Sequence, residues 1–384
     1  MHSLTGRITY PVMLAAFRSV KRNRGAAGVD QQSIGMFESN LEENLLSLMR
    51  ELKTRGAFRP LPLRRVYIDK SPTQKRPIGI PVVRDRVAQE VLRGLLSPVF
   101  ERVFHDDSYG FRPRRNCHQA LERIRELHSQ GYVHVLDADI KGFFDNIPHE
   151  VILTALRAEV ADGNILTLIE RFLRSGVVED DVLKPTEMGT PQGGVISPLL
   201  ANIVLNQLDW QLHHHGYQFV RYADDFVVLC RTAKQAEEAK ALVVQVLTGI
   251  GLSLHPTKTR CTTRKDKYEF LGFSIGSNSM KMRPKAVEKF RDNVRKLTRR
   301  SNNLDAKVLD RINALIRGTA NYFGTSFSSC VKQFTTLDQW LRMRLRCMKY
   351  KRKSVRDHYK LRVKYLERRG LLSLVRLLES AKVA

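Results

Sequence analysis

The sequence predicts an α+β fold in which a region of antiparallel strands and helices precedes a basic, mostly helical region. Apolar residues alternate with others over 132–140, and two apolar runs flank a turn within 218–230, as expected of a half-buried strand and a β-hairpin. From Pro284 onward the pattern is helical and rich in Lys and Arg. A boundary near residue 280 is expected between the two regions.

The first region begins with residues 1–60, which are expected to be helical and rich in loops, with a turn at 24–30. Residues 62–81 predict a basic hairpin, because two strand-like runs are joined at a Ser-Pro turn and closed by a proline. A helix is expected at about 84–104, followed by a basic loop and an amphipathic helix within 109–131.

The later elements alternate helices with strands. Helices are expected around 151–174 and 194–215, on either side of the Gly-rich loop KPTEMGTPQGGVISP, and again at 232–251. LSLHPTKT and YEFLGFSI have the composition of strands. The basic region is expected to form three helices, at about 284–300, 304–323 and 330–349.

Composition places the 384-residue chain among soluble globular proteins, with 42% hydrophobic and 27% charged residues. No apolar run reaches the ~20 residues that span a bilayer, and the first twenty residues lack the apolar block of a signal peptide. The five cysteines form no CxxC pair, which argues against a disulfide framework or a zinc site. We therefore expect a cytoplasmic protein and no membrane partner.

The charge is concentrated in the last quarter of the chain. Residues 281–384 hold 28 Lys and Arg against 8 Asp and Glu, a net charge of +20, whereas the formal charge of the whole chain is +26. Within 341–369 only Asp357 and Glu367 interrupt the basic run, so the acids that usually accompany a solvated basic helix are missing. This pattern predicts binding to nucleic acid.

A second feature is a group of aspartates in the first region. Asp224 and Asp225 stand at the turn of the 218–230 hairpin, and Asp139 ends a strand 85 residues upstream. Antiparallel strands lying side by side would bring these carboxylates together, where they repel one another unless a cation lies among them. Oxygen ligands alone suit Mg²⁺, and two such ions are a known device for phosphoryl transfer. Turn-capping aspartates are the alternative, and spacing alone does not exclude Asp137.

Nine blocks in order resemble the bacterial group II intron-encoded reverse transcriptase/maturase family. They run GAAGVD, KRPIGIPVVRDRVAQEVL, YGFRPRRNCHQAL, DIKGFFDNIPHE, GTPQGGVISPLLANI, RYADDFVVL, GLSLHPTKT, YEFLGF and RGTANYFG. The resemblance implies a right-hand polymerase: fingers and palm with an antiparallel palm sheet at 1–280, a helical thumb or maturase X domain at 281–350, and a basic tail at 351–384. The resemblance also implies a bacterial protein associated with nucleoid or ribonucleoprotein. A Cys/His-bearing endonuclease is not expected.

The resemblance also implies the catalytic carboxylates, Asp139, Asp224 and Asp225. Asp139 and Asp224 would hold two Mg²⁺ ions together with the Ile140 carbonyl, and Asp225 would support the site less directly. The family pattern places the ligand immediately before IKGFF, which favours Asp139 over Asp137.

Five residues are expected at the incoming nucleotide. The resemblance implies that Phe144 would lie under the sugar and collide with a ribose 2′-hydroxyl, unless it is a core neighbour of Phe143. Lys70 and Arg76, on opposite arms of the basic hairpin, would clamp the triphosphate, with Lys75 as a competitor.

The other two follow from the resemblance. Gln192, in GTPQGG, would contact the nucleotide, and the adjacent glycines would let the backbone approach a base or sugar; an ordinary Gly-rich loop is the alternative. Lys258 is a candidate general acid for pyrophosphate, or else an exposed turn lysine.

Eight residues are expected to contact nucleic-acid backbone, which carries no sequence information. Those in the fingers are Arg112, Arg114 and Asn116, and those in the thumb and tail are Arg291, Arg295, Arg342, Arg346 and Arg352.

The resulting hypothesis is an RNA-directed DNA polymerase that uses dNTPs. It binds group II intron RNA, assists its splicing, and copies it into cDNA at a DNA target during retrohoming. The alternatives are an intron-derived enzyme of phage defence or CRISPR adaptation, and a maturase that only folds RNA.

Overall fold

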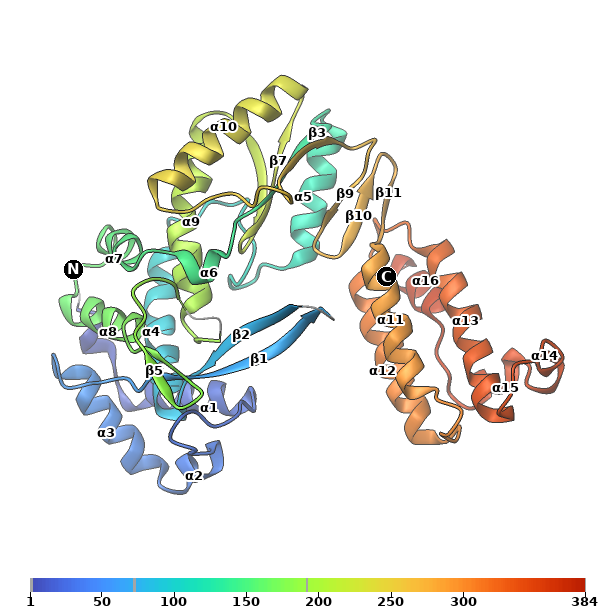
Figure 1. The fold of residues 1–384 in the computed structure, drawn as a ribbon, viewed down its shortest axis with the longest axis horizontal. Helices are drawn as coiled ribbons and strands as arrows, with labels where there is room; N and C mark the ends of the chain where they lie inside the picture. The colour runs from blue at the N-terminus through green and yellow to red at the C-terminus, as the bar shows by residue number, and fades with distance from the viewer. Residues whose placement is uncertain (1–2, 72–73, 191–192, 384) are drawn as a thin grey trace. The chain divides into compact units, whose positions relative to one another are not determined.

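The computed structural model describes residues 3–71, 74–190 and 193–383. The chain divides into two compact units, Met1–Cys261 and Thr262–Ala384, and each is described by itself. Largely antiparallel sheets and helices occur together in the first unit (Figure 1), so the predicted α+β class is confirmed. No helix among the described residues is long and apolar enough to cross a membrane.

The strands of the first unit form two four-stranded sheets. One has the order β2-β1-β4-β5 and the other β6-β7-β3-β8, the last strand running into the second unit. Their bounds are β1 Leu63–Ser71, β2 Gln74–Ile80, β3 His134–Asp139, β4 Val177–Glu179, β5 Val182–Lys184, β6 Gln218–Tyr222, β7 Asp225–Cys230 and β8 Arg260–Thr263.

The helices of the first unit enclose one apolar core. They are α1 Tyr10–Arg22, α2 Ile34–Ser39, α3 Leu41–Lys53, α4 Val83–Phe100, α5 Cys117–Ser129, α6 Phe143–Asn146, α7 His149–Arg157, α8 Gly163–Leu173, α9 Ser197–His214 and α10 Ala233–Gly249, after a 3-10 turn at Thr5–Arg7. Helix α10 packs on β3 and β7, and α9 packs against α7, α10 and β6. Because α9 is buried on nearly every side, it supports the β6-β7 hairpin from within the core.

The second unit contains a small sheet and a helical bundle. Strands β9 Tyr268–Phe270, β10 Phe273–Gly276 and β11 Ser279–Met282 form an antiparallel sheet. The helices are α11 Pro284–Leu297, α12 Ala306–Phe323, α13 Val331–Tyr350, α14 Asp357–Lys360, α15 Val363–Arg368 and α16 Leu374–Val383. The three helices expected from the basic region are present as α11, α12 and α13.

The expected separate tail at 351–384 differs from the structure. Leu361, Leu366, Leu374 and Leu378 are buried in one core with the residues of α11, α12 and α13. Asp338, buried in α13, accepts hydrogen bonds from the Leu374 amide at 3.0 Å and the Ser373 hydroxyl at 2.6 Å at the start of α16. The tail therefore completes the fold of the second unit.

Three other details differ from the sequence expectation. The change between units falls after Cys261 and not near 280, because the sheet of β9, β10 and β11 clusters with the helices. LSLHPTKT forms only an isolated bridge at Leu254, and the strand comes later, as β8. The short hairpin of β4 and β5 was not expected; its turn places Asp180 at φ 51° and Asp181 at φ 62°.

Candidate active site

The sheet register brings the three predicted carboxylates to one end of β3. Strands β3 and β7 are antiparallel, with Asp139 opposite Asp225, and β6 pairs with β7 so that Tyr222 also faces Asp225. Ala223 and Asp224 make the turn between β6 and β7. The placement of Asp139 beside the Asp224–Asp225 turn, expected from the strand pattern, is what the register shows.

The electrostatic setting of Asp224 favours the arrival of a cation. Burial raises the pKa of Asp224 above its usual value, and the negative charge of Asp139 raises it further; Arg76 and Arg221 act in the opposite direction. A carboxylate that is both buried and near another carboxylate is costly to ionise. A bound divalent ion would lower that cost.

The ligand atoms that these residues offer are of the kind that a hard divalent cation prefers. Asp139, Asp224 and Asp225 offer carboxylate oxygens, which suit Mg²⁺. The backbone bonds beside the Ile140–Leu254 bridge use the Lys141 amide (2.9 Å to the Ser253 carbonyl) and the Asp139 carbonyl (2.7 Å from the His255 amide). Neither of these bonds uses the Ile140 carbonyl. Among the described residues, however, no three His, Cys, Asp or Glu side chains are already gathered as a metal-binding group.

A basic segment lies against the same carboxylates. Lys258 Nζ donates to Asp139 Oδ2 at 2.7 Å, and Arg260 Nε donates to Asp137 Oδ2 at 3.3 Å. The Lys258 side chain is 53% exposed, so it can exchange this partner for another anion. Asp137 is thus placed with Arg260, on the same strand face as Asp139 but paired to a different cation.

The ring of Phe144 is only partly buried. Phe143 belongs to the core, whereas Phe144 packs against the edge of that core, with the two rings 5.3 Å apart. The Phe144 ring therefore keeps some solvent-exposed surface, whereas the neighbouring Phe143 ring is buried in the core.

The Gly-rich loop packs against protein backbone. A Cβ at Gly189, whose φ is 88°, would lie 2.8 Å from the Asp145 carbonyl and 2.9 Å from the Phe144 carbonyl. A Cβ at Gly193 would lie 2.2 Å from the Gly79 carbonyl of β2. These glycines were expected to permit close approach to a base or sugar; in the structure they permit close approach to the Phe144 segment and to β2.

The basic hairpin places Arg76 opposite Ile68 in the β1-β2 register. Arg76 is exposed, and its charge lowers the pKa of Asp145 as well as that of Asp224, against the upward effect of burial on both. Gln192 and the side chain of Lys70 lie outside the described part of the chain.

The side chains of two predicted nucleic-acid contacts, Arg112 and Arg346, are buried in the structure. Arg112 is buried; it donates to the His105 and Ser108 carbonyls at 2.6 and 2.7 Å and pairs with Glu101 at 3.1 Å. Arg346 is buried too and donates to the Leu361 carbonyl at 2.9 Å. Both guanidinium groups hold loops in place and are not presented to phosphate.

The other predicted contacts lie nearer the surface. Arg114 is exposed in the loop before α5, and Asn116 caps that helix, accepting from the Gln119 amide at 3.0 Å. In the second unit Arg342 is half-buried, and Arg352 pairs with the buried Asp357 at 3.0 Å.

Arg291 and Arg295 lie over the ring of Trp340, each 5.8 Å from its centroid, and Arg295 also pairs with Glu288 and Asp292. Arg295 is therefore partly neutralised within its own helix.

Sequence reasoning missed a buried polar group beneath the turn, formed by Arg221, Asp209 and Asn202. The available signal was a charged residue of each sign inside an apolar element: Arg221 in the strand QFVRY and Asp209 in the helix LANIVLNQLDW. Charged residues are rarely fully buried unless they are paired.

Comparison with known proteins gives two matches along the chain. Residues 68–275 match the reverse transcriptase (RNA-dependent DNA polymerase) family, and residues 287–366 match the group II intron maturase-specific domain. Protein YkfC of Escherichia coli (strain K12) is 34% identical over 310 residues, covering 70% of this chain and 81% of that protein.

Two further relatives differ in how much they share. The group II intron-encoded protein LtrA of Lactococcus lactis subsp. cremoris is 39% identical over 201 residues, covering 52% of this chain and 33% of its own length. The uncharacterized 91 kDa protein in the cob intron of Schizosaccharomyces pombe is 31% identical over 327 residues, covering 69% of this chain and 40% of its own length. This chain thus spans well under half of either intron protein.

Proposed function

This chain belongs to the group II intron-encoded reverse transcriptase/maturase family, and from that premise we propose that it copies group II intron RNA into cDNA and assists the splicing of that RNA. The family is that of RNA-directed DNA polymerases. The observation that carries the proposal for this chain is the register that sets Asp139 opposite Asp225, with Asp224 in the adjoining turn.

In this proposal Asp139, Asp224 and the Ile140 carbonyl would hold two Mg²⁺ ions, which would supply activation of the primer 3′-hydroxyl and stabilisation of the leaving pyrophosphate. Arg76 and Lys70 bind the triphosphate, and Gln192 contacts the nucleotide. Phe144 restricts the sugar. Lys258 leaves Asp139 and donates a proton to the pyrophosphate, a role that its exposure and its 2.7 Å contact with Asp139 allow.

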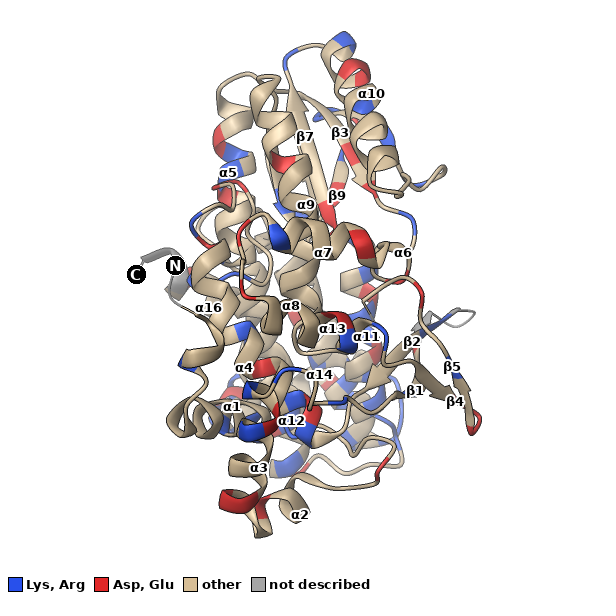
Figure 2. Cartoon of the chain, turned by 90° about the vertical axis from the view of Figure 1, so that its left-hand side faces the viewer, with Lys and Arg blue, Asp and Glu red and all other residues tan. Residues whose placement is uncertain are grey.

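The second unit supplies the grip on intron RNA and on the primer or target DNA. Figure 2 shows Lys and Arg on α11, α12 and α13. Such contacts are to phosphate and serve intron RNA, template and primer alike.

The first test replaces Asp224 with Asn. Primer extension on an RNA template with Mg²⁺ and dNTPs should fall by at least about a hundredfold, because a metal ligand is lost. RNA affinity and splicing of the flanking intron should stay near wild type, because the change removes no phosphate contact. Asp162→Asn, far along the chain at the start of α8, serves as the matched control.

The outcomes separate the candidate functions. Extension by Asp224→Asn above about a hundredth of the wild-type rate would overturn the role of Asp224. Splicing assistance without any extension by the wild-type protein would instead identify a maturase that acts only on RNA folding.

A further inference from the structure

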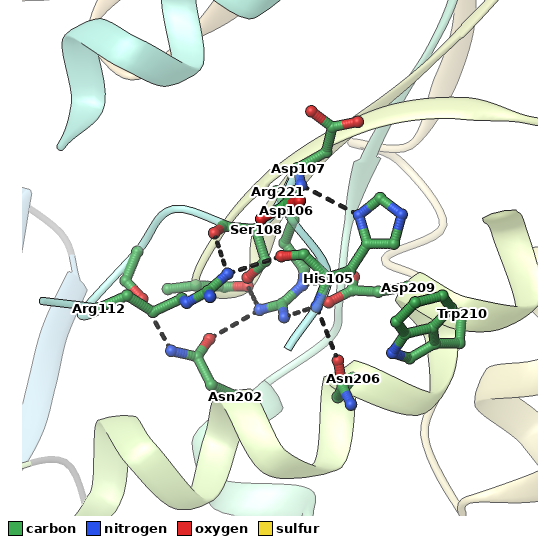
Figure 3. Close-up of polar contacts among 12 residues, drawn as sticks. His105, Asp106, Asp107, Ser108, Arg112, Asn202, Asn206, Asp209, Trp210 and Arg221 are labelled. Carbon is green, nitrogen blue, oxygen red and sulfur yellow. Dashed lines mark hydrogen bonds and ion pairs between the residues drawn. The ribbon is translucent and has the colours of Figure 1, made fainter. Parts of the chain in front are cut away.

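A fully buried ion pair lies beneath the turn that carries Asp224. Arg221 in β6 donates from Nε to Asp209 Oδ1 at 2.7 Å and from Nη2 to Asp209 Oδ2 at 2.5 Å. Both side chains are excluded from solvent almost completely, with exposures of 1% and 0%. Figure 3 shows Asp209 reaching this guanidinium from α9.

The same guanidinium bonds the turn itself. Arg221 Nη1 donates to the Ala223 carbonyl at 3.0 Å. Ala223 is buried and has φ 61°, a left-handed conformation that costs a residue with a Cβ about 1–2 kcal/mol. The bond therefore holds a strained peptide whose carbonyl belongs to the same peptide plane as the Asp224 amide.

A third residue connects this turn to the loop after α4. Asn202 Oδ1 accepts from Arg221 Nη1 at 2.8 Å, while Asn202 Nδ2 donates to the Gly110 carbonyl at 2.7 Å. The loop is also bonded to β6, since the Tyr109 amide donates to the Arg221 carbonyl at 2.8 Å. At Gly110 a Cβ would lie 2.4 Å from the Ala223 nitrogen, so the loop presses directly on the turn.

We propose that Arg221 is a positioning residue for polymerisation: held by Asp209 and Asn202, it fixes the Ala223–Asp224 peptide and thereby the direction of the Asp224 carboxylate. The inference rests on the proposed role of Asp224. Stability alone does not account for the arrangement, because a buried ion pair is often replaceable by apolar residues without loss. An apolar replacement could not donate to the Ala223 carbonyl.

The test compares Arg221→Lys and Asp209→Asn with Asp162→Asn. Asp162 also accepts several hydrogen bonds, from Thr5 and Ser3 among others, and is remote in sequence from the turn. Three quantities are measured: single-nucleotide addition against Mg²⁺ concentration, primer–template affinity, and hydrogen exchange of the segment Gln218–Cys230 in protein without nucleotide or metal. Circular dichroism verifies folding. If Arg221→Lys does not fold, Asn202→Ala, which keeps the ion pair, takes its place.

We expect both variants to exchange faster in the hairpin segment and to need about 10–100-fold more Mg²⁺ for half-maximal rate. Primer–template affinity should change less than about twofold, and Asp162→Asn should alter none of the three. Combined with Asp224→Asn, Arg221→Lys should add no further loss of rate, because it acts through Asp224.

Wild-type exchange and an unchanged Mg²⁺ curve in folded Arg221→Lys and Asp209→Asn would overturn the inference, as would the same shift in Asp162→Asn. An additive loss in the double variant would show that Arg221 acts elsewhere. If Asp224→Asn alone retains activity, the proposed role of Asp224 is wrong whatever Arg221 does. The failure of the proposed function can therefore be told apart from the failure of the inference about Arg221.

Discussion

At the scale of single residues, the adjacent Phe143 and Phe144 differ in their burial, and we assign them different roles. Phe143 is 2% exposed in the core, and Phe144 covers the edge of that core. The sequence alone left both roles open for Phe144, because two neighbouring apolar residues give the same pattern.

Phe144→Val is expected to reduce discrimination between dGTP and GTP by about tenfold or more, because a smaller side chain leaves room for the 2′-hydroxyl. Incorporation of each nucleotide is measured by single-nucleotide addition on an RNA template. Phe143→Leu is the control and should lower thermal stability without changing the ratio. If Phe144→Val leaves the ratio of dGTP to GTP incorporation unaltered, Phe144 has a packing role only.

Other residues show which side-chain positions could be predicted from the sequence and which could not. The proximity of Asp139 to the Asp224–Asp225 turn was predictable because strand periodicity and one hairpin fix the neighbours of these residues. The burial of Arg112 and Arg346 was not, because a basic residue in a basic segment looks the same whether it binds phosphate or a backbone carbonyl. Asp209 and Arg221 are twelve residues apart, and only the packing of α9 on β6 reveals that they pair.

At the scale of elements, helix α4 contains a buried carboxyl group that titrates unusually. Burial raises the pKa of Asp85 to about 7. The Leu61 amide donates to Asp85 Oδ2 at 2.8 Å, while Oδ1 has no hydrogen-bond partner among the described residues. The folded protein therefore retains a proton that the unfolded chain releases near pH 4.

The free energy of unfolding is consequently expected to fall as pH rises from about 4 to about 7, and Asp85→Asn should abolish this part of the decline. Asn keeps an oxygen for the Leu61 amide, so the variant should be more stable than wild type by about 2–4 kcal/mol at pH 8, and by little near pH 4. Urea denaturation across this range measures the difference.

Asp162→Asn provides a control of opposite sign. Burial of Asp162 is outweighed by hydrogen bonds from Thr5 and Ser3, so its pKa is lowered. The stability that Asp162 contributes is present above its unfolded pKa and is lost as pH falls, so this variant should be weakened most at pH 8. A constant difference between Asp85→Asn and wild type across pH would contradict the buried-acid account.

Element prediction was reliable where length and periodicity were strong, as for α11, α12 and α13. It failed for the three-residue strands β4 and β5, whose left-handed turn of Asp180 and Asp181 carries no strong local signal. It also misplaced the strand at LSLHPTKT, because β8 is defined by pairing with β3 and not by its own composition.

At the scale of the whole molecule, the charge of +20 on residues 281–384 predicts strongly salt-dependent RNA binding. Removal of the last residues is unsuitable as a test, because Leu374 and Leu378 are fully buried in the second unit. Charge must instead be removed at the exposed surface.

Four exposed positions in this region serve that purpose: Lys353, Arg356, Lys360 and Arg362, each replaced by Gln. For every phosphate that is no longer neutralised, the slope of log affinity against log salt should decrease by about 0.7–0.9. Splicing assistance should weaken more than polymerisation on a short template. The control replaces four basic residues of α3 and α10, of which three are exposed and Lys240 is half-buried: Arg50, Lys53, Lys234 and Lys240. Equal slopes in the two variants would exclude this surface as the RNA grip.

The buried pair of Arg221 and Asp209 also has a consequence for descent. Loss of either partner leaves the other charge buried and uncompensated, which typically costs about 3–5 kcal/mol. A lineage that changes one of these codons therefore passes through a less stable ancestor unless the other changes too. We therefore expect the two positions to be inherited as a single character, so that a homologue that lacks the arginine also lacks the aspartate.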